Sequence, residues 1–285
     1  VVNGGHPGSI NAIFSILSWY LIKKNKSVIY NFHNLASKPN YKNFLINLLT
    51  NIVILLFTCK IITVSKAALK SIENIYLLRN KTSKIIYNGT IDFGNNKQNF
   101  SKKKKNIFLI LASYEKRKGI HVAIEAFNIF CNTVNNYQLH IYGDKNAGYF
   151  SEINKRWTSL KNKSKIKINS FNQNNLYLIK KCDALIMPSI EFESFGYTLI
   201  EAMSLKKIVL AANTGGMPEI IKNNFNGYIF KPDSAKSLNN KLFFFVKENQ
   251  HKKNIIRKNA RNSFLKYFNS KDMYKKYIRE IKIIK

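Results

Sequence analysis

The order of hydrophobic and polar positions predicts strands and helices in alternation along the first third of the chain. Short apolar, β-branched runs are typical of strands buried on both faces of a parallel sheet, and longer stretches with apolar residues at helical spacing lie between them. We expect four strands, at 1–3, 28–32, 61–64 and 84–87, with Gly4 and Gly5 forming a loop after the first. The pattern is that of βαβ units, so this part is predicted to be α/β.

A second series of the same kind begins near residue 106. We expect strands at 106–112, 137–143, 184–189 and 208–212, and helices at 119–130 and near 197–204. Past Tyr228 the pattern becomes helical, and Tyr, Ile and Lys recur at helical spacing from Asp272 to the end. The fold class is therefore predicted as α/β, with two Rossmann-like doubly wound domains facing a cleft where ligands bind at strand carboxyl ends.

The polar stretch between the two series predicts the domain boundaries. It contains the Lys run 102–105 and has no apolar periodicity, which is typical of a linker. We therefore expect a first domain at 1–92, a linker at 93–105, a second domain at 106–269, and a C-terminal helix at 270–285 that crosses back to the first domain. The apolar run 44–59 is too short for a confident membrane span and contains polar residues, so we expect a buried helix there.

The charge of the chain raises the question of an anionic partner. The sequence has 47 Lys plus Arg against 15 Asp plus Glu, a formal net charge of +32, yet only six of the basic residues are Arg. Lys, Asn and Ile are all abundant, so a coding bias explains the charge as well as an anionic partner does. Nucleic acid is not expected, because the chain lacks paired-Cys fingers, RNP-like aromatic signatures and basic heptads. Three widely spaced cysteines predict neither a disulfide framework nor a metal site.

The segment PSIEFESFGYTLIEAM, at 188–203, carries the clearest chemistry. Gly196 lies where a helix should begin, and the free N–H groups of a helix start attract phosphate or sugar oxygens. Glu193 precedes this start and Glu201 follows two turns later; a carboxylate can accept hydrogen bonds from both hydroxyls of a ribose. Taken alone, the two glutamates also fit a helix-dipole partner and a surface residue.

Five motifs in order resemble the donor-binding domain of the retaining glycosyltransferases of family 4, also called glycosyl transferases group 1. They are EKRKGIHVAIEAF, LHIYGD, CDALIMPS, the two glutamates seven residues apart, and NTGGMPEIIKNNFNGYIF. VVNGGHPGS, VIYNFHN, IITVSKAAL and IIYNGTID resemble later strands of the acceptor-side domain. The resemblance implies the GT-B fold of two facing Rossmann-like domains. Because the family's first domain opens with further βα units, it also implies a chain incomplete at its N-terminus.

The resemblance implies roles for individual residues. Glu193 would contact the donor sugar, and Glu201 would hold the nucleotide ribose. Backbone amides at Phe195, Gly196 and Tyr197 would bind sugar hydroxyls or phosphate.

Five further positions complete the implied site. Lys118 matches the lysine that neutralises the departing diphosphate, a role that suits a fixed ammonium because bond breaking builds charge on that group. His33 matches a histidine near the reacting sugar. Ser113 and its neighbour stand where the family commonly has Gly-Arg, and Gly215 and Gly216 belong to the last of the five motifs.

The implied activity is transfer of a sugar from a nucleotide-diphosphate donor to a sugar or lipid-linked acceptor, with retention of configuration. Cell-surface polysaccharide or glycolipid synthesis is the expected context. No metal and no cofactor are expected, and the expected place is the cytoplasm, with an anionic membrane surface as a further partner. The alternative is a catalytically inactive GT-B nucleotide-sugar-binding module or subunit, which the missing Arg and the missing N-terminal units favour.

Overall fold

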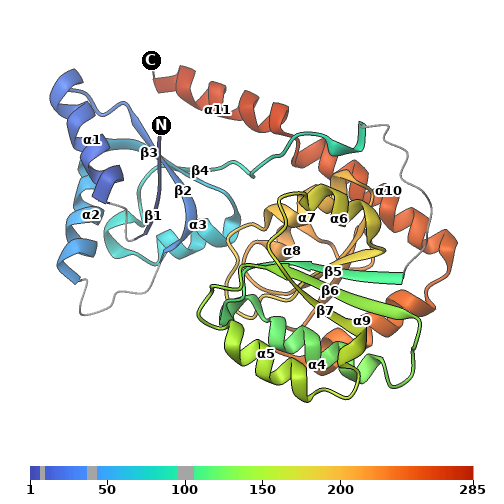
Figure 1. Cartoon of the computed structure of the whole chain (residues 1–285). Coiled ribbons are helices and arrows are strands. Elements are labelled where there is room, and N and C mark those ends of the chain that lie inside the picture. The colour runs from blue at the N-terminus through green and yellow to red at the C-terminus, as the bar shows by residue number, and fades with distance from the viewer. Residues whose placement is uncertain (7–9, 37–43, 96–105, 285) are drawn as a thin grey trace. The chain divides into compact units, whose positions relative to one another are not determined.

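The structure, a computed structural model, describes residues 1–6, 10–36, 44–95 and 106–284 (Figure 1). Contacts divide the chain into two compact units. The first unit comprises Val1–Gly89, Glu193–Phe195 and Ser270–Lys285, and the second comprises Thr90–Phe192 and Gly196–Asn269. Residues 96–105, which hold most of the predicted linker and its Lys run, lie outside the described residues.

The first unit is built on a parallel four-stranded sheet in the order β1-β2-β3-β4. Its core has two layers of side chains, one on each sheet face. Val28, Tyr30 and Phe32 of β2 pack with α1 and α2, while Ile29 packs with α11 on the other face. The elements are β1 (Val2–His6), α1 (Ile10–Lys23), β2 (Val28–Ala36), α2 (Phe44–Phe57), β3 (Thr58–Thr63), α3 (Lys66–Glu73), η2 (Tyr76–Leu78), β4 (Ser83–Ile85) and α11 (Ser270–Ile284).

The four predicted strands of the first unit are confirmed, with two corrections. Gly4 and Gly5 do not form a loop after the first strand, because β1 continues through both. A Cβ on Gly4 would lie 2.1 Å from the Tyr30 hydroxyl, so the glycine makes room for that ring. The second strand is longer than the predicted range 28–32 and contains His33.

The helix expected at 44–59 is confirmed as α2, but only one side of it is buried. Helix α2 buries Asn47, Thr50, Asn51 and Ile54, while Leu45 and Leu49 are exposed. Within the described residues, no helix combines the length and apolarity needed to cross a membrane.

Helix α11 packs against the first unit through a nearly buried ion pair. The Lys60 ammonium on β3 lies 2.6 Å from a Glu280 carboxylate oxygen, and the exposed fractions of these side chains are 16% and 10%. Met273, Tyr277 and Ile281 of the same helix contact the sheet face formed by Ile29, Ile62 and Ile86. The last helix of the chain therefore completes the core of the first unit.

The second unit has a six-stranded parallel sheet in the order β10-β9-β8-β5-β6-β7. Helices α4, α5 and α9 cover one face, and α6, α7, α8 and α10 cover the other (Figure 1), so the predicted doubly wound arrangement is confirmed. Phe108 on β5 stacks on Tyr137 and meets Phe245 of α9 edge to face, in the centre of the core. The strands are β5 (Asn106–Leu111), β6 (Tyr137–Gly143), β7 (Ile166–Ser170), β8 (Ala184–Met187), β9 (Ile208–Ala212) and β10 (Tyr228–Phe230).

Seven α-helices and three short 3-10 helices complete the second unit within the described residues. They are η3 (Phe93–Asn95), η4 (Lys116–Lys118), α4 (Ile120–Phe130), α5 (Phe150–Ser159), η5 (Lys163–Lys165), α6 (Asn175–Lys181), α7 (Tyr197–Ser204), α8 (Met217–Ile220), α9 (Ala235–Lys247) and α10 (Gln250–Tyr267). The helices expected at 119–130 and near 197–204 are confirmed as α4 and α7. Strands β7 and β10 were not predicted.

The segment that enters the second unit is fixed by Arg261 of α10. Its guanidinium forms a two-pronged ion pair with the Asp92 carboxylate and also donates to the Ser204 backbone oxygen at 2.9 Å. The exposed fractions of the Arg261 and Asp92 side chains are 11% and 17%. The second unit accordingly begins at Thr90, slightly before the predicted boundary after residue 92.

Replacement of Arg261 by Met is expected to lower the free energy of unfolding by about 2 kcal/mol, because Asp92 would lose its partner in a largely desolvated site. The Arg261 hydrogen bond lowers the pKa of Asp92, so the pair stabilises the fold above about pH 4 and this contribution is lost on acidification through the folded pKa. Between pH 7 and pH 3, the melting temperature of the unsubstituted protein should therefore fall more steeply than that of the variant. Arg156→Met, which removes an exposed pair with Glu152, is the control and should change little.

Candidate functional site

Three neighbouring loops at one edge of the second sheet carry the candidate donor-binding residues. They follow β5, β8 and β9, which are adjacent in the sheet. The chain winds from β5 through β6 to β7 and then returns to β8 on the other side of β5, so the strand order reverses between β5 and β8. Open α/β sheets bind ligands at such a switch point. The candidates at this edge are Ser113, Lys118, Gly196, Tyr197, Glu201, Gly215 and Gly216.

The loop after β5 is organised around Glu115, which the sequence analysis did not single out. The Ser113 hydroxyl donates to one carboxylate oxygen of Glu115 at 2.5 Å, and Nε of Arg117 donates to the other at 2.7 Å. The Ser113 hydrogen bond and the Arg117 guanidinium lower the pKa of Glu115. The Ser113 hydroxyl, which the resemblance placed against the donor, is thus directed to Glu115. Lys118 follows at the end of η4 and is half-buried.

Gly119 joins the β5 loop to the β8 loop. Its φ of 65° lies in the left-handed region, and a Cβ there would come within 2.0 Å of the Pro188 backbone oxygen. The Ile190 amide donates to the Arg117 backbone oxygen at 2.9 Å, which adds a hydrogen bond between the same loops. The backbone that carries Lys118 is therefore held against the backbone that leads to α7.

Helix α7 begins directly after Gly196, as predicted. Gly196 has a φ of 95°, a conformation that favours glycine, and its backbone oxygen accepts from the Leu199 amide at 3.1 Å. The amides of the first turn give this end of the helix a partial positive charge. Tyr197 is exposed at the start of the helix.

Glu201 lies one turn further along α7 and is half-buried. Burial raises the pKa of its carboxyl group, and in the part of the chain that the structure describes no cation or hydrogen-bond donor counteracts this effect. A carboxylate held in this way is costly for the fold, and it is available to a ligand that brings its own hydroxyl donors.

The loop after β9 contains Gly215 and Gly216. Gly215 has a φ of 56°, and buried Gly216 precedes the short helix α8. The Met217 amide donates a hydrogen bond to the Thr214 backbone oxygen at 3.3 Å. The turn brings the backbone of both glycines to the same sheet edge as the loops after β5 and β8.

The other predicted residues belong to the first unit. Nε2 of His33 lies 2.8 Å from Nδ2 of Asn31, which also donates to Oδ1 of Asn3 at 2.9 Å. Burial lowers the pKa of His33, so the neutral ring predominates at pH 7. Glu193 and Phe195 are grouped with this unit, and Glu193 is half-buried while Phe195 is buried.

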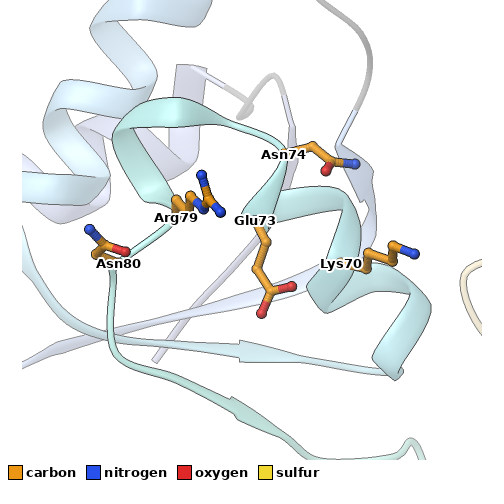
Figure 2. A pocket seen from close by; sticks show the side chains of 5 residues that line it. All are labelled: Lys70, Glu73, Asn74, Arg79 and Asn80. Carbon is orange, nitrogen blue, oxygen red and sulfur yellow. The ribbon is translucent and has the colours of Figure 1, made fainter.

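A polar hollow of about 620 Å³ lies elsewhere in the first unit. Figure 2 shows the five side chains that line it, from the end of α3 and the turn that leads to β4: Lys70, Glu73, Asn74, Arg79 and Asn80. These residues precede β4, so the hollow is at the amino-terminal edge of a parallel sheet, whereas ligands of such sheets bind at the carboxyl edge. We assign it no part in the candidate site.

Comparison with protein families gives one match, which covers more than half of the chain. The family described as "Glycosyl transferases group 1" matches residues 93–263. This range includes Lys118, Glu193 and Glu201, and all three loops at the carboxyl edge of the second sheet.

Curated proteins and solved structures are also similar to the chain. The uncharacterized glycosyltransferase MJ1178 of Methanocaldococcus jannaschii is 25% identical over 69% of this chain and 52% of its own length. The N,N'-diacetylbacillosaminyl-diphospho-undecaprenol alpha-1,3-N-acetylgalactosaminyltransferase of Campylobacter jejuni is 29% identical over 32% of this chain and 23% of its own length. The chain thus spans about half the length of the Methanocaldococcus relative.

The crystal structure of Anabaena Alr3699/HepE in complex with UDP resembles the chain with a TM-score of 0.81. It is 20% identical, and the likeness covers 96% of this chain and 77% of that one. This likeness confirms the fold class: both units, each with a parallel sheet, are those of GT-B proteins.

Proposed function

The chain belongs to the glycosyl transferases group 1 family, and on that premise we propose that it binds a nucleotide-diphosphate sugar and transfers the sugar to an acceptor. The observation that carries this proposal is Glu201, a half-buried carboxylate beside the switch point of the second sheet for which the described residues provide no cation. The two hydroxyl groups of a ribose diol can each donate a hydrogen bond to such a carboxylate. That the similar Anabaena HepE structure contains UDP supports a nucleotide as part of the donor.

In the proposed reaction the residues of the second unit act on the diphosphate. The Lys118 ammonium stabilises the negative charge that develops as the bond between sugar and phosphate breaks, and the amides at the start of α7 bind phosphate or sugar oxygens. The backbone of Gly215 and Gly216 lies next to the bound nucleotide-sugar donor. Glu193 contacts the donor sugar, and neutral His33 lies near the reacting sugar. The family resemblance supports these two assignments.

We propose retention of configuration, in the manner of family 4. The departing diphosphate accepts the acceptor's proton, so the mechanism requires no protein general base, metal or cofactor. A sugar or lipid-linked glycan in surface polysaccharide or glycolipid synthesis is the proposed acceptor, and the undecaprenol-linked acceptor in the Campylobacter relative's name supports it. The proposed place of action is the cytoplasmic face of an anionic membrane.

Replacement of Glu201 by Gln tests the donor site directly. UDP or GDP affinity, measured by isothermal titration calorimetry, should fall by about 10- to 100-fold, since charge-assisted hydrogen bonds contribute about 1.5–3 kcal/mol. Stability should rise at pH 7: the raised pKa means that ionised Glu201 destabilises the fold, a penalty that appears as the pH rises through that pKa and that Gln lacks. Glu125→Gln, on exposed α4 surface, should change neither quantity. Equal nucleotide affinities for all three proteins would refute the donor site.

A nucleotide-sugar-binding module without turnover is the second candidate. It is favoured by Ser113, which stands where the family commonly has Arg and whose hydroxyl is directed to Glu115. A transfer and hydrolysis assay with the nucleotide sugar that binds most tightly separates the two. Binding without turnover would select the inactive module.

A further inference from the structure

Helix α2 lacks the polar outer side that is usual for a surface helix. The side that packs on the first unit carries Ile54 together with three buried polar residues, Asn47, Thr50 and Asn51. The outward side carries Leu45, which is 71% exposed, and Leu49, which is 61% exposed. A water-facing helix places its polar residues outward, so this helix is suited to an apolar environment on its outer side.

Helix α1 extends the same surface. It lies beside α2 (Figure 1), and the Tyr20 ring meets the Phe57 ring edge to face at 4.7 Å. Both helices cover the same face of the sheet, so their outer sides point away from it together. The outward side chains define a surface that we call the apolar helix face: Phe14, Leu21, Ile22, Leu45, Leu49 and Leu56.

The stretch of chain that contains α1 and α2 carries charges of one sign. The first 72 residues contain eight Lys and no Asp or Glu, and Glu73 is the first acidic residue of the chain. Three of these lysines, Lys23, Lys24 and Lys26, are exposed directly after α1. They follow the Tyr20 turn that contacts the end of α2, so they border the apolar helix face.

We propose that the apolar helix face docks on the surface of an anionic phospholipid bilayer. Its Leu, Ile and Phe side chains enter the boundary between headgroups and acyl chains, and Lys23, Lys24 and Lys26 meet the headgroup phosphates. Helix α2 has 14 residues, about 21 Å of helix, which lies in this boundary and does not cross the roughly 30 Å hydrocarbon core. The inference rests on the proposed function, because docking brings the donor site to a lipid-linked acceptor.

Charge favours a bilayer over a second copy of the chain as the occupant. Two molecules that each carry a formal charge of +32 repel one another. The first 72 residues, which include the apolar helix face, contain no Asp or Glu that could pair with the lysines of a second copy. Anionic headgroups provide both the apolar layer and the complementary charge.

Vesicle flotation with the full chain tests the proposal. We expect binding to vesicles of phosphatidylcholine with phosphatidylglycerol, at least tenfold weaker binding to phosphatidylcholine alone, and release at high salt. Leu45→Gln with Leu49→Gln should reduce binding at least tenfold, and so should Lys23→Glu with Lys26→Glu. Matched controls on exposed sites of the second unit, Phe171→Gln with Phe225→Gln and Lys155→Glu with Lys258→Glu, should bind as the unsubstituted chain does.

Three outcomes would overturn the docking face: no vesicle binding, equal losses in the test and control variants, or self-association in sedimentation that the Leu45 and Leu49 substitutions abolish without any binding to vesicles. Titration of the same preparations with UDP measures nucleotide binding separately, so the docking face and the donor site are tested independently. Nucleotide binding without vesicle binding refutes only the docking face, and vesicle binding without nucleotide binding refutes only the donor site.

Discussion

A Lys118→Ala chain should transfer sugar about 100-fold or more slowly than the unsubstituted chain, with a much smaller change in nucleotide affinity. The charge on the diphosphate grows as the sugar leaves, so a fixed ammonium stabilises the transition state more than the bound donor. The backbone of Lys118 belongs to the Gly119 turn, and the glycine conformation of that turn does not depend on the Lys118 side chain. Single-turnover rates with saturating donor, set beside calorimetric affinities, measure the two effects separately.

The matched control for this substitution is Lys161→Ala, because Lys161 is exposed and precedes β7 at the opposite edge of the sheet. It should leave transfer unchanged. A chain with both Glu193 and Lys118 replaced by Ala should be inactive. If it still transferred sugar at the original rate, the catalytic assignment of both residues would be wrong.

The fold was predicted best where every residue of a strand is buried. The run IVLAA of β9 is wholly buried, and its predicted range is the observed one. The missed strand β7, IKINS, has exposed Lys and Ser positions at the edge of the sheet, so its sequence carries only a weak strand pattern. Helix α2 was predicted as a helix, but its environment was not, because an apolar run alone does not reveal which side faces inward.

The sequence predicted which loop positions form the candidate site, but it did not predict the contacts that hold these loops in place. Lys118 and Glu201 follow β5 and β8, as expected from the motifs, because strand order alone places these loops at one edge. The role of Glu115 depends on two hydrogen bonds across a loop, from Ser113 and Arg117, that no spacing in the sequence specifies. The only signal was an acidic residue followed by three basic ones, and basic runs are common in a chain with this charge.

Gly119→Ala is expected to destabilise the second unit by about 3 kcal/mol, because a non-glycine residue at this positive φ is strained and its Cβ would meet the Pro188 backbone oxygen. A loss of that size should lower the melting temperature by about 6–12 °C in a domain of this size. Nucleotide affinity should fall as well, since relief of the clash separates the β5 loop, with Lys118, from the β8 loop that leads to Glu201. Calorimetric melts and UDP titrations measure both effects.

Gly148→Ala is the matched control for this substitution. Gly148 belongs to the same unit, and a Cβ there would meet nothing within 4 Å, so melting temperature and UDP affinity should stay unchanged. If Gly119→Ala behaved like the control, the close approach of the two loops would not hold the site together. If it lowered stability and left UDP affinity unchanged, the turn would support the fold alone, and the coupling between Lys118 and the start of α7 would have to be abandoned.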